Sequence, residues 1–346
     1  MRTLLRSFGI VALVPVLGLL ALELTAPGTW SGIAYALGLG LLSLALIMVG
    51  RRPARRLALG ATALLGGTIA LRLATGAGGS DLQMKTGTTP GSRWVNRIVD
   101  EKDLSVNAAR TIRATQFMKD PDVTLLPEAM EDAYERMRAA EGDVPSPQLA
   151  TLLGLQSKDA YDDIEIGDVA HASGALVFLH GSAGGFTLPC WEVSQAATRA
   201  NLATVCPSTG WLGDWWSPQG EAIVRATVAD LRARGVKHVF LAGLSNGGIG
   251  ASRLLPRMPG TFEGFIAISG AAPDAPPAGI PVLALQGRND AQVSAAVVHA
   301  YCTRSGGHYV EYDGGHFALL LHEKDAVDAM ATWLSARVPA RAVAKN

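Results

Sequence analysis

Residues 238–248 constrain the fold of this chain more than any other segment. A run of β-branched, aromatic and other apolar residues leads into a Gly-x-Ser-x-Gly pentapeptide centred on Ser245, and a helix-compatible segment follows. This pattern predicts a serine on a sharp turn from a strand into a helix. The turn requires a positive φ at the serine, and a side chain at Gly243 or Gly247 would collide across it. The N-terminus of the following helix favours negative charge that develops beside the serine.

Two later strands are each followed by a residue that a reactive serine needs. Residues 281–287 form an apolar run that ends in glycine, and Asp290 follows it, while residues 308–312 lead into a glycine-flanked loop that carries His316. Taken alone, such an aspartate is often a helix cap. In open α/β sheets, however, the loops after the carboxyl ends of the strands build the site. The chain order Ser245, Asp290, His316 therefore predicts a nucleophile, an acid and a base.

A fourth loop carries candidate hydrogen-bond donors. Residues 175–180 predict another buried strand, and a glycine-rich loop at 181–185 follows it. Backbone N–H groups of a loop in this place bind an oxyanion together with the N–H of the residue after the nucleophile. We expect these donors to be Ser182, with Ala183 as the alternative, and Asn246. A glycine-rich turn with no such role is the competing interpretation.

The motifs of these four loops are His-Gly at 180–181, Gly-Leu-Ser-Asn-Gly-Gly at 243–248, Gly-Arg-Asn-Asp at 287–290 and Gly-Gly-His-Phe at 314–317. In this combination they resemble the α/β-hydrolase superfamily, especially compact serine esterases and dienelactone-hydrolase-like members. The resemblance begins near Tyr161 and covers a little over half of the chain. It implies an α/β fold with a doubly wound, mostly parallel sheet. The usual first strands are not evident in the sequence, so the resemblance implies a trimmed sheet.

The resemblance also implies a chemistry, which is acyl transfer from a small ester-like substrate through an acyl-serine. His316 would take the proton of Ser245 and return it to the leaving group. Asp290 would hold one tautomer of His316 and stabilise its charged form. Each oxyanion donor is typically worth about 3 kcal/mol. We expect no cofactor and no metal, because the chain has no HExxH or CxxC pair and its glycine-rich loops lack the lysine of a P-loop.

Three apolar runs precede residue 78, and they predict transmembrane spans at about 8–22, 32–50 and 57–74. Arg72 near the end of the third run is expected to reach toward the membrane interface. A cleaved signal peptide is the alternative for the first run, although Glu23 and Pro27 make a poor cleavage site.

The basic residues predict how these spans are oriented. Arg2, Arg6 and the arginine cluster at 51–56 are expected to lie in the cytoplasm. Three spans then place the rest of the chain outside the cytoplasm. If the short third run does not insert, the same rule leaves the enzyme in the cytoplasm.

Two cysteines and three tryptophans are expected close to the site. Cys190 and Cys206 are both predicted at the carboxyl edge of the sheet, where they would form a disulfide or be two small buried residues. The loop after the Cys206 strand carries Trp211, Trp215 and Trp216, which would line an acyl pocket or pin the loop to the core.

The sequence as a whole predicts a multi-pass membrane protein with one catalytic domain. Its parts are a transmembrane region at 1–77, a linker and helical segment at 78–160 that packs on or caps the sheet, and an α/β-hydrolase domain at 161–340. The formal net charge of +0 argues against nucleic acid as a partner, and the sequence indicates no particular oligomeric state. The predicted function is a membrane-anchored carboxylesterase. The alternatives are an acyltransferase or peptidase with the same triad, or a non-catalytic binding domain.

Overall fold

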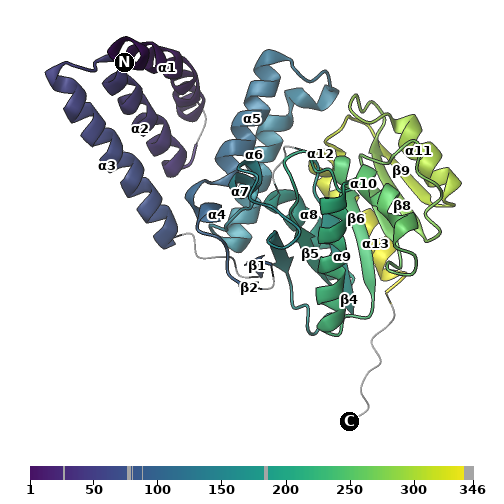
Figure 1. The fold of residues 1–346 in the computed structure, drawn as a ribbon. Helices are drawn as coiled ribbons and strands as arrows, with labels where there is room; N and C mark the ends of the chain where they lie inside the picture. Colours follow the sequence, from purple (N-terminus) through teal and green to yellow (C-terminus); the bar gives the residue numbers. More distant parts are fainter. Residues whose placement is uncertain (26–27, 76–78, 80, 88, 183–185, 339–346) are drawn as a thin grey trace.

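The structure is a computed structural model that describes residues 1–25, 28–75, 79, 81–87, 89–182 and 186–338. This part of the chain builds one nine-stranded sheet with the order β2-β1-β3-β5-β4-β6-β7-β8-β9 (Figure 1). The strands are β1 (Leu82–Thr86), β2 (Thr89–Pro90), β3 (Asp162–Ile166), β4 (Gly174–Leu179), β5 (Leu202–Pro207), β6 (Val239–Leu244), β7 (Phe265–Ile268), β8 (Val282–Gly287) and β9 (His308–Tyr312).

The sheet is mostly parallel. Strands β4 to β9 pair in parallel, whereas β1, β2 and β3 join the edge next to β5 in antiparallel pairs. From β4 the chain passes to β5 on one side and later to β6 on the other. Ligands bind in open α/β sheets at such a change of direction, beyond the carboxyl ends of the strands. The predicted doubly wound, mostly parallel sheet is confirmed.

The expectation of a trimmed sheet is wrong, because β1 and β3 extend it. Strand β1 lies inside the segment 78–160 that was expected to hold only linker and helices. Strand β3 was missed because its sequence, Asp-Asp-Ile-Glu-Ile, lacks an apolar pattern, although all its residues are buried. Ion pairs allow Glu165 to be buried, since Lys85 lies 2.7 Å and Arg234 2.5 Å from its carboxylate.

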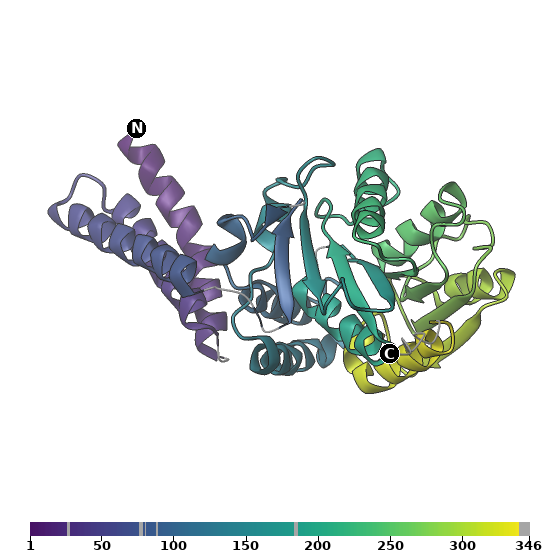
Figure 2. The same cartoon turned by 90° about the horizontal axis from the view of Figure 1, so that it is seen from below.

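The core consists of two apolar layers, one on each face of the sheet. Strand residues alternate between them, so that Leu176 and Phe178 face one layer and Val177 and Leu179 the other. The first layer is covered by α6 (Leu126–Glu141), α8 (Thr187–Arg199), α12 (Ala318–Leu321) and α13 (Glu323–Ser335), and the second by α9 (Pro218–Ala233), α10 (Asn246–Leu254), η2 (Leu255–Arg257) and α11 (Ala295–Arg304) (Figures 1 and 2).

A helical segment connects β2 to β3 and packs beside the sheet. It contains α4 (Val95–Ile98), α5 (Glu101–Thr115), η1 (Pro121–Thr124), α6 and α7 (Gln148–Leu152). Helix α6 carries an apolar stripe. Ala133, Tyr134 and Met137 enter the core of the sheet, whereas Met130 is only partly buried. The helix both packs on the sheet and reaches its carboxyl edge.

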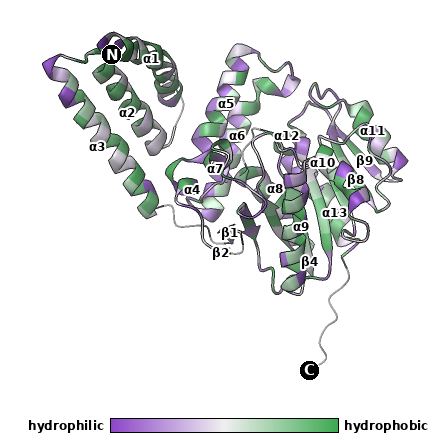
Figure 3. Ribbon diagram, in the orientation of Figure 1, coloured by the Kyte–Doolittle hydropathy of each residue, from purple (hydrophilic) through white to green (hydrophobic). Residues whose placement is uncertain are grey.

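Three long helices form a separate bundle at the N-terminal end (Figures 1 and 2). They are α1 (Arg2–Thr25), α2 (Trp30–Ile47) and α3 (Arg52–Thr75). Each is long and apolar enough to cross a membrane, judged by length and composition. Large apolar side chains such as Phe8, Val11 and Val14 are exposed on α1, and Figure 3 shows hydrophobic colour along all three helices.

Polar contacts join this bundle to the helical segment. The Arg72 guanidinium at the end of α3 is buried and lies 2.6 Å from the Asp143 carboxylate and 3.5 Å from that of Asp100. Asp103 on α5 accepts hydrogen bonds from the backbone N–H and the hydroxyl of Thr29, the N-cap of α2. Arg72 is thus held by carboxylates of the segment that supports the sheet.

Candidate active site

Ser245 occupies the sharp turn between β6 and α10. Its backbone has φ 54° and ψ −118°, a strained conformation for a residue with a side chain. Its N–H donates to the carbonyl of Ile268 at 2.8 Å. A Cβ at Gly247 would lie 1.9 Å from the carbonyl oxygen of Leu179, so only glycine fits there. This is the local geometry that the Gly-x-Ser-x-Gly pattern predicts.

The structure brings the three predicted side chains together. His316 Nε2 lies 2.9 Å from Ser245 Oγ, and His316 Nδ1 lies 2.8 Å from Asp290 Oδ2. The serine follows β6, the aspartate follows β8 and the histidine follows β9. Both Asp290 and His316 are buried, so water competes little for their hydrogen bond. The arrangement lets His316 accept the hydroxyl proton of the serine.

Asp290 is held as a carboxylate. Burial raises its pKa, but the hydrogen bond and charge of His316 and the backbone N–H groups of Val293 and Gln292 outweigh this, so the pKa lies below its usual value. Those two N–H groups donate to Oδ1 at 2.9 and 2.7 Å, and Gln286 Nε2 donates to Oδ2 at 2.8 Å. An ionised Asp290 favours a proton on His316 Nδ1, which leaves Nε2 free to act as a base.

The two expected oxyanion donors lie next to the serine. Ser182 Oγ donates to the carbonyl of Leu212 at 2.8 Å, and Asn246 Nδ2 donates to Ser182 Oγ at 2.6 Å. These bonds tie the loop after β4 to the start of α10. Because Asn246 is the first residue of α10, its backbone N–H has no partner within the helix. The alternative donor, Ala183, lies outside the residues that the structure describes.

The neutral side chain of His180 holds the start of the loop after β4. Its Nδ1 donates to the carbonyl of Gly181 at 2.7 Å, and its Nε2 accepts from the N–H of Thr209 at 3.2 Å. The rings of Phe186 and Trp215 meet it edge-on, with centroids 4.1 and 5.0 Å away. Burial lowers the pKa of His180 to about 3. The residue therefore holds the loop after β4 without changing charge at neutral pH.

The sequence analysis did not find Asp120, which contacts the loops of both the acid and the base. Its Oδ2 accepts hydrogen bonds from the backbone N–H of Ala291 at 3.1 Å and of His316 at 3.0 Å. The carboxylate approaches so closely that a Cβ at Gly315 would lie 1.9 Å from Oδ1. Asp120 precedes η1, far from these loops in the sequence.

Asp122 makes a second pair of contacts to the histidine loop. Its Oδ1 accepts from the N–H of Gly315 at 2.7 Å and its Oδ2 from the N–H of Phe317 at 2.9 Å. The backbone on both sides of His316 is thus held by one Asp-Pro-Asp segment. In the sequence this segment looks like an ordinary helix start, since an aspartate before a proline is a common cap. We refer to Asp120 and Asp122 as the aspartate clamp.

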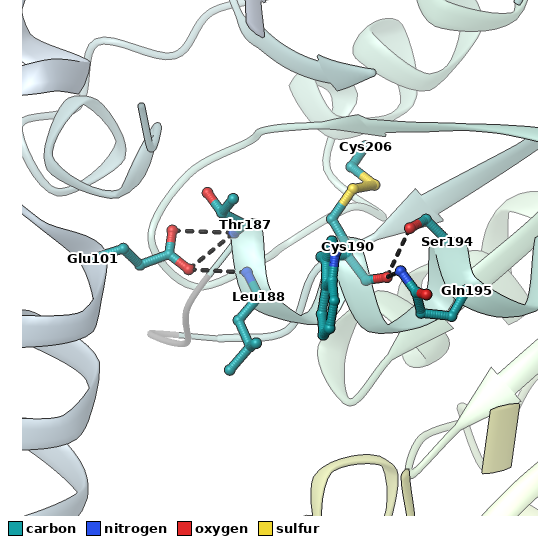
Figure 4. Close-up of a disulfide and its surroundings, with 8 residues drawn as sticks. Glu101, Thr187, Leu188, Cys190, Ser194, Gln195 and Cys206 are labelled. Atoms are coloured by element: carbon teal, nitrogen blue, oxygen red, sulfur yellow. Dashed lines mark hydrogen bonds between the residues drawn. A yellow bond between two sulfur atoms is a disulfide. The ribbon is translucent and has the colours of Figure 1, made fainter. Parts of the chain in front are cut away.

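Glu101 holds the start of α8, next to the loop after β4 (Figure 4). Its carboxylate accepts from the N–H groups of Thr187 and Leu188 at 2.9 to 3.1 Å. Tyr134 donates to the same carboxylate at 2.9 Å, and Ser146 also donates to it. A carboxylate at a helix N-terminus is stabilised by the helix dipole. α5 therefore positions α8 although the two are distant in the sequence.

A disulfide joins Cys190 on α8 to Cys206 on β5 (Figure 4). It links the helix behind the cavity to the sheet next to β4. The remaining cysteine, Cys302, is buried and free.

A cavity of about 350 Å³ opens at Ser245. Its wall is mostly apolar, and helices α6, α8 and α12 each contribute side chains to it. Described residues that line it are Met118, Met130, Tyr134, Gly181, Ser182, Leu188, Pro189, Glu192, Leu244, Ser245, Asn246, Ile249, Gln292, Val293, His316, Phe317, Leu319 and Leu320. Met130, only partly buried on α6, belongs to this wall. Among the described residues no cluster of His, Cys, Asp or Glu is arranged to hold a metal.

Of the two interpretations of the three tryptophans, lining the pocket is not what the structure shows. Trp211, Trp215 and Trp216 are described, but they are not part of the cavity wall. Trp215 is fully buried and donates to the carbonyl of His180 at 2.9 Å. The ring of Trp216 lies 5.4 Å from the Arg253 guanidinium. The other interpretation holds for Trp215, which pins its loop to the core because its N–H finds a partner only there.

The sheet order, the change of direction between β5 and β6, and the serine on the turn between β6 and α10 define the α/β-hydrolase architecture. No protein-family model and no curated protein sequence matches the chain.

Several solved structures resemble it. One is the esterase Est1E from Butyrivibrio proteoclasticus with ferulic acid bound, at 12% identity and a TM-score of 0.45, covering 52% of this chain and 96% of that chain. A second is the Pyrococcus furiosus esterase Pf2001, at 13% identity and a TM-score of 0.44, covering 53% and 91%. A third is XC6422 from Xanthomonas campestris, an α/β serine hydrolase without a lid, at 19% identity and a TM-score of 0.42, covering 53% and 92%.

Proposed function

We propose that this protein is a membrane-anchored serine hydrolase that cleaves carboxylic esters through an acyl-serine on Ser245. The observation that carries the proposal is the hydrogen-bonded series from Ser245 through His316 to Asp290 at the wall of an apolar cavity. A binding domain has no use for an acid, a base and a nucleophile aligned in this way. The apolar wall suits the hydrocarbon part of a small ester.

In the proposed mechanism the ester carbonyl lies between Ser245 and the donors of the loop after β4. His316 Nε2 takes the hydroxyl proton as Oγ attacks the carbonyl carbon, and Asp290 stabilises the imidazolium. The backbone N–H groups of Ser182 and Asn246 bind the oxyanion. His316 then protonates the leaving alcohol, and the acyl-serine is hydrolysed by a water that His316 deprotonates.

A fluorophosphonate probe tests this proposal, since it reacts only with an activated serine. We expect the wild-type protein to be labelled and Ser245→Ala to lose all labelling. Ser335→Ala, which removes an exposed hydroxyl at the end of α13, is the control and should label like wild type. Parallel assays with p-nitrophenyl esters and with amide substrates distinguish an esterase from a peptidase. A folded wild-type protein that does not react would favour the non-catalytic binding domain.

We further propose that α1, α2 and α3 anchor the enzyme and that the sheet lies outside the cytoplasm. Their exposed apolar side chains favour a lipid environment. The basic residues Arg2 and Arg6 and the cluster at 51–56 favour the cytoplasm for the ends that carry them. The disulfide between Cys190 and Cys206 favours an oxidising compartment for the other side. Because β1 pairs with β3 in the sheet, the catalytic unit in this proposal begins at β1 rather than near residue 161.

Thiol counting in the full-length protein tests this placement. After denaturation without reductant, an alkylating reagent should modify one thiol, that of Cys302, and after reduction all three. Replacing Cys190 and Cys206 together by serine should lower the free energy of unfolding by about 3 kcal/mol, because the disulfide closes a loop of 16 residues. Cys302→Ala serves as the control and should leave no thiol before reduction. Three reactive thiols in unreduced protein would contradict the extracytoplasmic placement.

A further inference from the structure

Among the described residues of the cavity wall at Ser245, one carries an acidic side chain, Glu192 on α8. It is 2% exposed, and around it the cavity is lined by apolar side chains of α6, α8 and α12. Leu188, one helical turn earlier, lines the same cavity, so this face of α8 forms the wall. A buried carboxyl in an apolar pocket is unfavourable unless a partner compensates for its lost hydration.

Within the described part of the chain, Glu192 Oε1 has no hydrogen-bond partner. The hydroxyl of Tyr134, which also lines the cavity, is already bonded to Glu101 and Ser105. Buried polar atoms are rarely left without partners in native proteins. The missing partner of Glu192 is therefore expected to arrive with the ligand that fills the cavity.

The surroundings of Glu192 favour its neutral form. Burial raises its pKa well above the usual value, and the nearby charge of Glu323 acts in the same direction, with Arg136 opposing. The guanidinium of Arg136 is itself paired with Glu323 and with Asp132. A neutral carboxyl has one O–H donor and a carbonyl acceptor, which matches a hydroxyl or carbonyl group and not a cation.

Glu192 lies away from the loop that carries the oxyanion donors. It is five residues beyond Thr187, the first residue of α8, which corresponds to about 7.5 Å along the helix axis. A polar group beside Glu192 would therefore belong to another part of the substrate than the ester carbonyl at Ser245. Leu188 and Met130 line the same cavity, so an apolar stretch of the substrate can lie between the two.

We propose that Glu192 is a specificity-determining residue that hydrogen-bonds a neutral hydroxyl or carbonyl group on the distal part of the acyl chain. The inference rests on the proposed esterase function and names its substrate class, which is esters of medium-length acids with a polar, uncharged group beyond an apolar stretch. An n-alkanoyl ester would leave the Glu192 carboxyl buried and unpaired.

Matched pairs of p-nitrophenyl esters test the proposal, each pair differing only in a terminal hydroxyl, from butanoyl to decanoyl. At one chain length we expect wild type to prefer the hydroxylated ester by about 10-fold or more in kcat/KM. Glu192→Leu should reverse this preference, mainly through KM, and accelerate the alkanoyl ester. Glu192→Gln, whose amide also donates and accepts hydrogen bonds, should keep most of the preference for the hydroxylated ester. Glu263→Gln, which alters an exposed acidic residue outside the cavity wall, is the matched control and should keep the wild-type ratio.

Three results would overturn this assignment. One is an equal change on both esters of a pair in Glu192→Leu, which indicates a purely structural residue. Another is a wild-type preference for a terminal trimethylammonium group that Glu192→Gln abolishes, which indicates an ionised carboxylate. The third is no preference at any chain length. Fluorophosphonate labelling of the same samples separates these results from failure of the proposed function, because an active serine labels whatever the acyl preference.

Discussion

Replacing His316 by alanine should lower kcat/KM for ester hydrolysis by about 10⁴- to 10⁶-fold while the protein stays folded. The imidazole is the only described group that contacts Ser245 Oγ as a base, through Nε2 at 2.9 Å. Without it the hydroxyl keeps its ordinary, very high pKa and attacks slowly. Steady-state hydrolysis of a p-nitrophenyl ester, with circular dichroism to verify folding, measures the loss.

The design of this experiment uses the dependence of the three side chains on one another. Because Ser245 and His316 act as a unit, the double variant Ser245→Ala/His316→Ala should be no slower than either single variant. His322→Ala is the matched control, since His322 lies on the same segment but its imidazole contacts the carbonyl of Asp313 at 2.9 Å and the ring of Tyr312 instead of Ser245. Additive losses, or a His316→Ala enzyme within 10-fold of wild type, would contradict the proposed triad.

Replacing Asp122 in the aspartate clamp by alanine should lower kcat by about 10²- to 10³-fold, although Asp122 does not contact Ser245. Its carboxylate accepts from the N–H groups of Gly315 and Phe317, which flank His316. Loss of both bonds leaves two backbone donors unsatisfied and lets the histidine loop move. The free energy of unfolding should fall by about 2 to 4 kcal/mol, because each buried unpaired group costs about 1 to 3 kcal/mol and the Phe317 contact is only partly buried.

A positioning role is distinguished from simple instability by counting active molecules. Fluorophosphonate titration gives the number of reactive serines, and kcat per reactive serine should fall while KM changes little. Asp122→Asn, which retains one acceptor oxygen, should recover part of kcat. Asp132→Ala, which removes an exposed aspartate of α6, should behave like wild type. If kcat per reactive serine is unchanged in Asp122→Ala, the clamp has only a structural role.

The local part of the site was predictable because its rules act over a few residues. The turn at Ser245 needs glycine on both sides, and an apolar run that ends in glycine predicts the strand before Asp290. Residues 308–312, with a β-branched residue between two aromatic ones, likewise predict the strand before His316. Since parallel strands end at one edge, these separate predictions already imply that the three side chains meet. The structure shows them hydrogen-bonded at that edge.

Long-range contacts were not predictable in the same way. The aspartate clamp reaches loops that are 171 to 196 residues away in the sequence. In the sequence, Asp120 and Asp122 are indistinguishable from helix caps. For Trp215, position in the sequence suggested a place at the site that it does not take. Its loop follows a strand near the site, but its ring packs inward on His180.

The sequence by itself determined the strand-turn-helix elements, the chain order of serine, aspartate and histidine, and the three apolar N-terminal helices, because periodicity and turn chemistry are local properties. Only the tertiary structure decided that β1 and β3 complete the sheet and that Glu192 faces the cavity. These outcomes depend on partners that neutralise or desolvate polar groups, such as Arg234 beside Glu165. Such partners come from distant segments, so their effect exists only once the chain has folded.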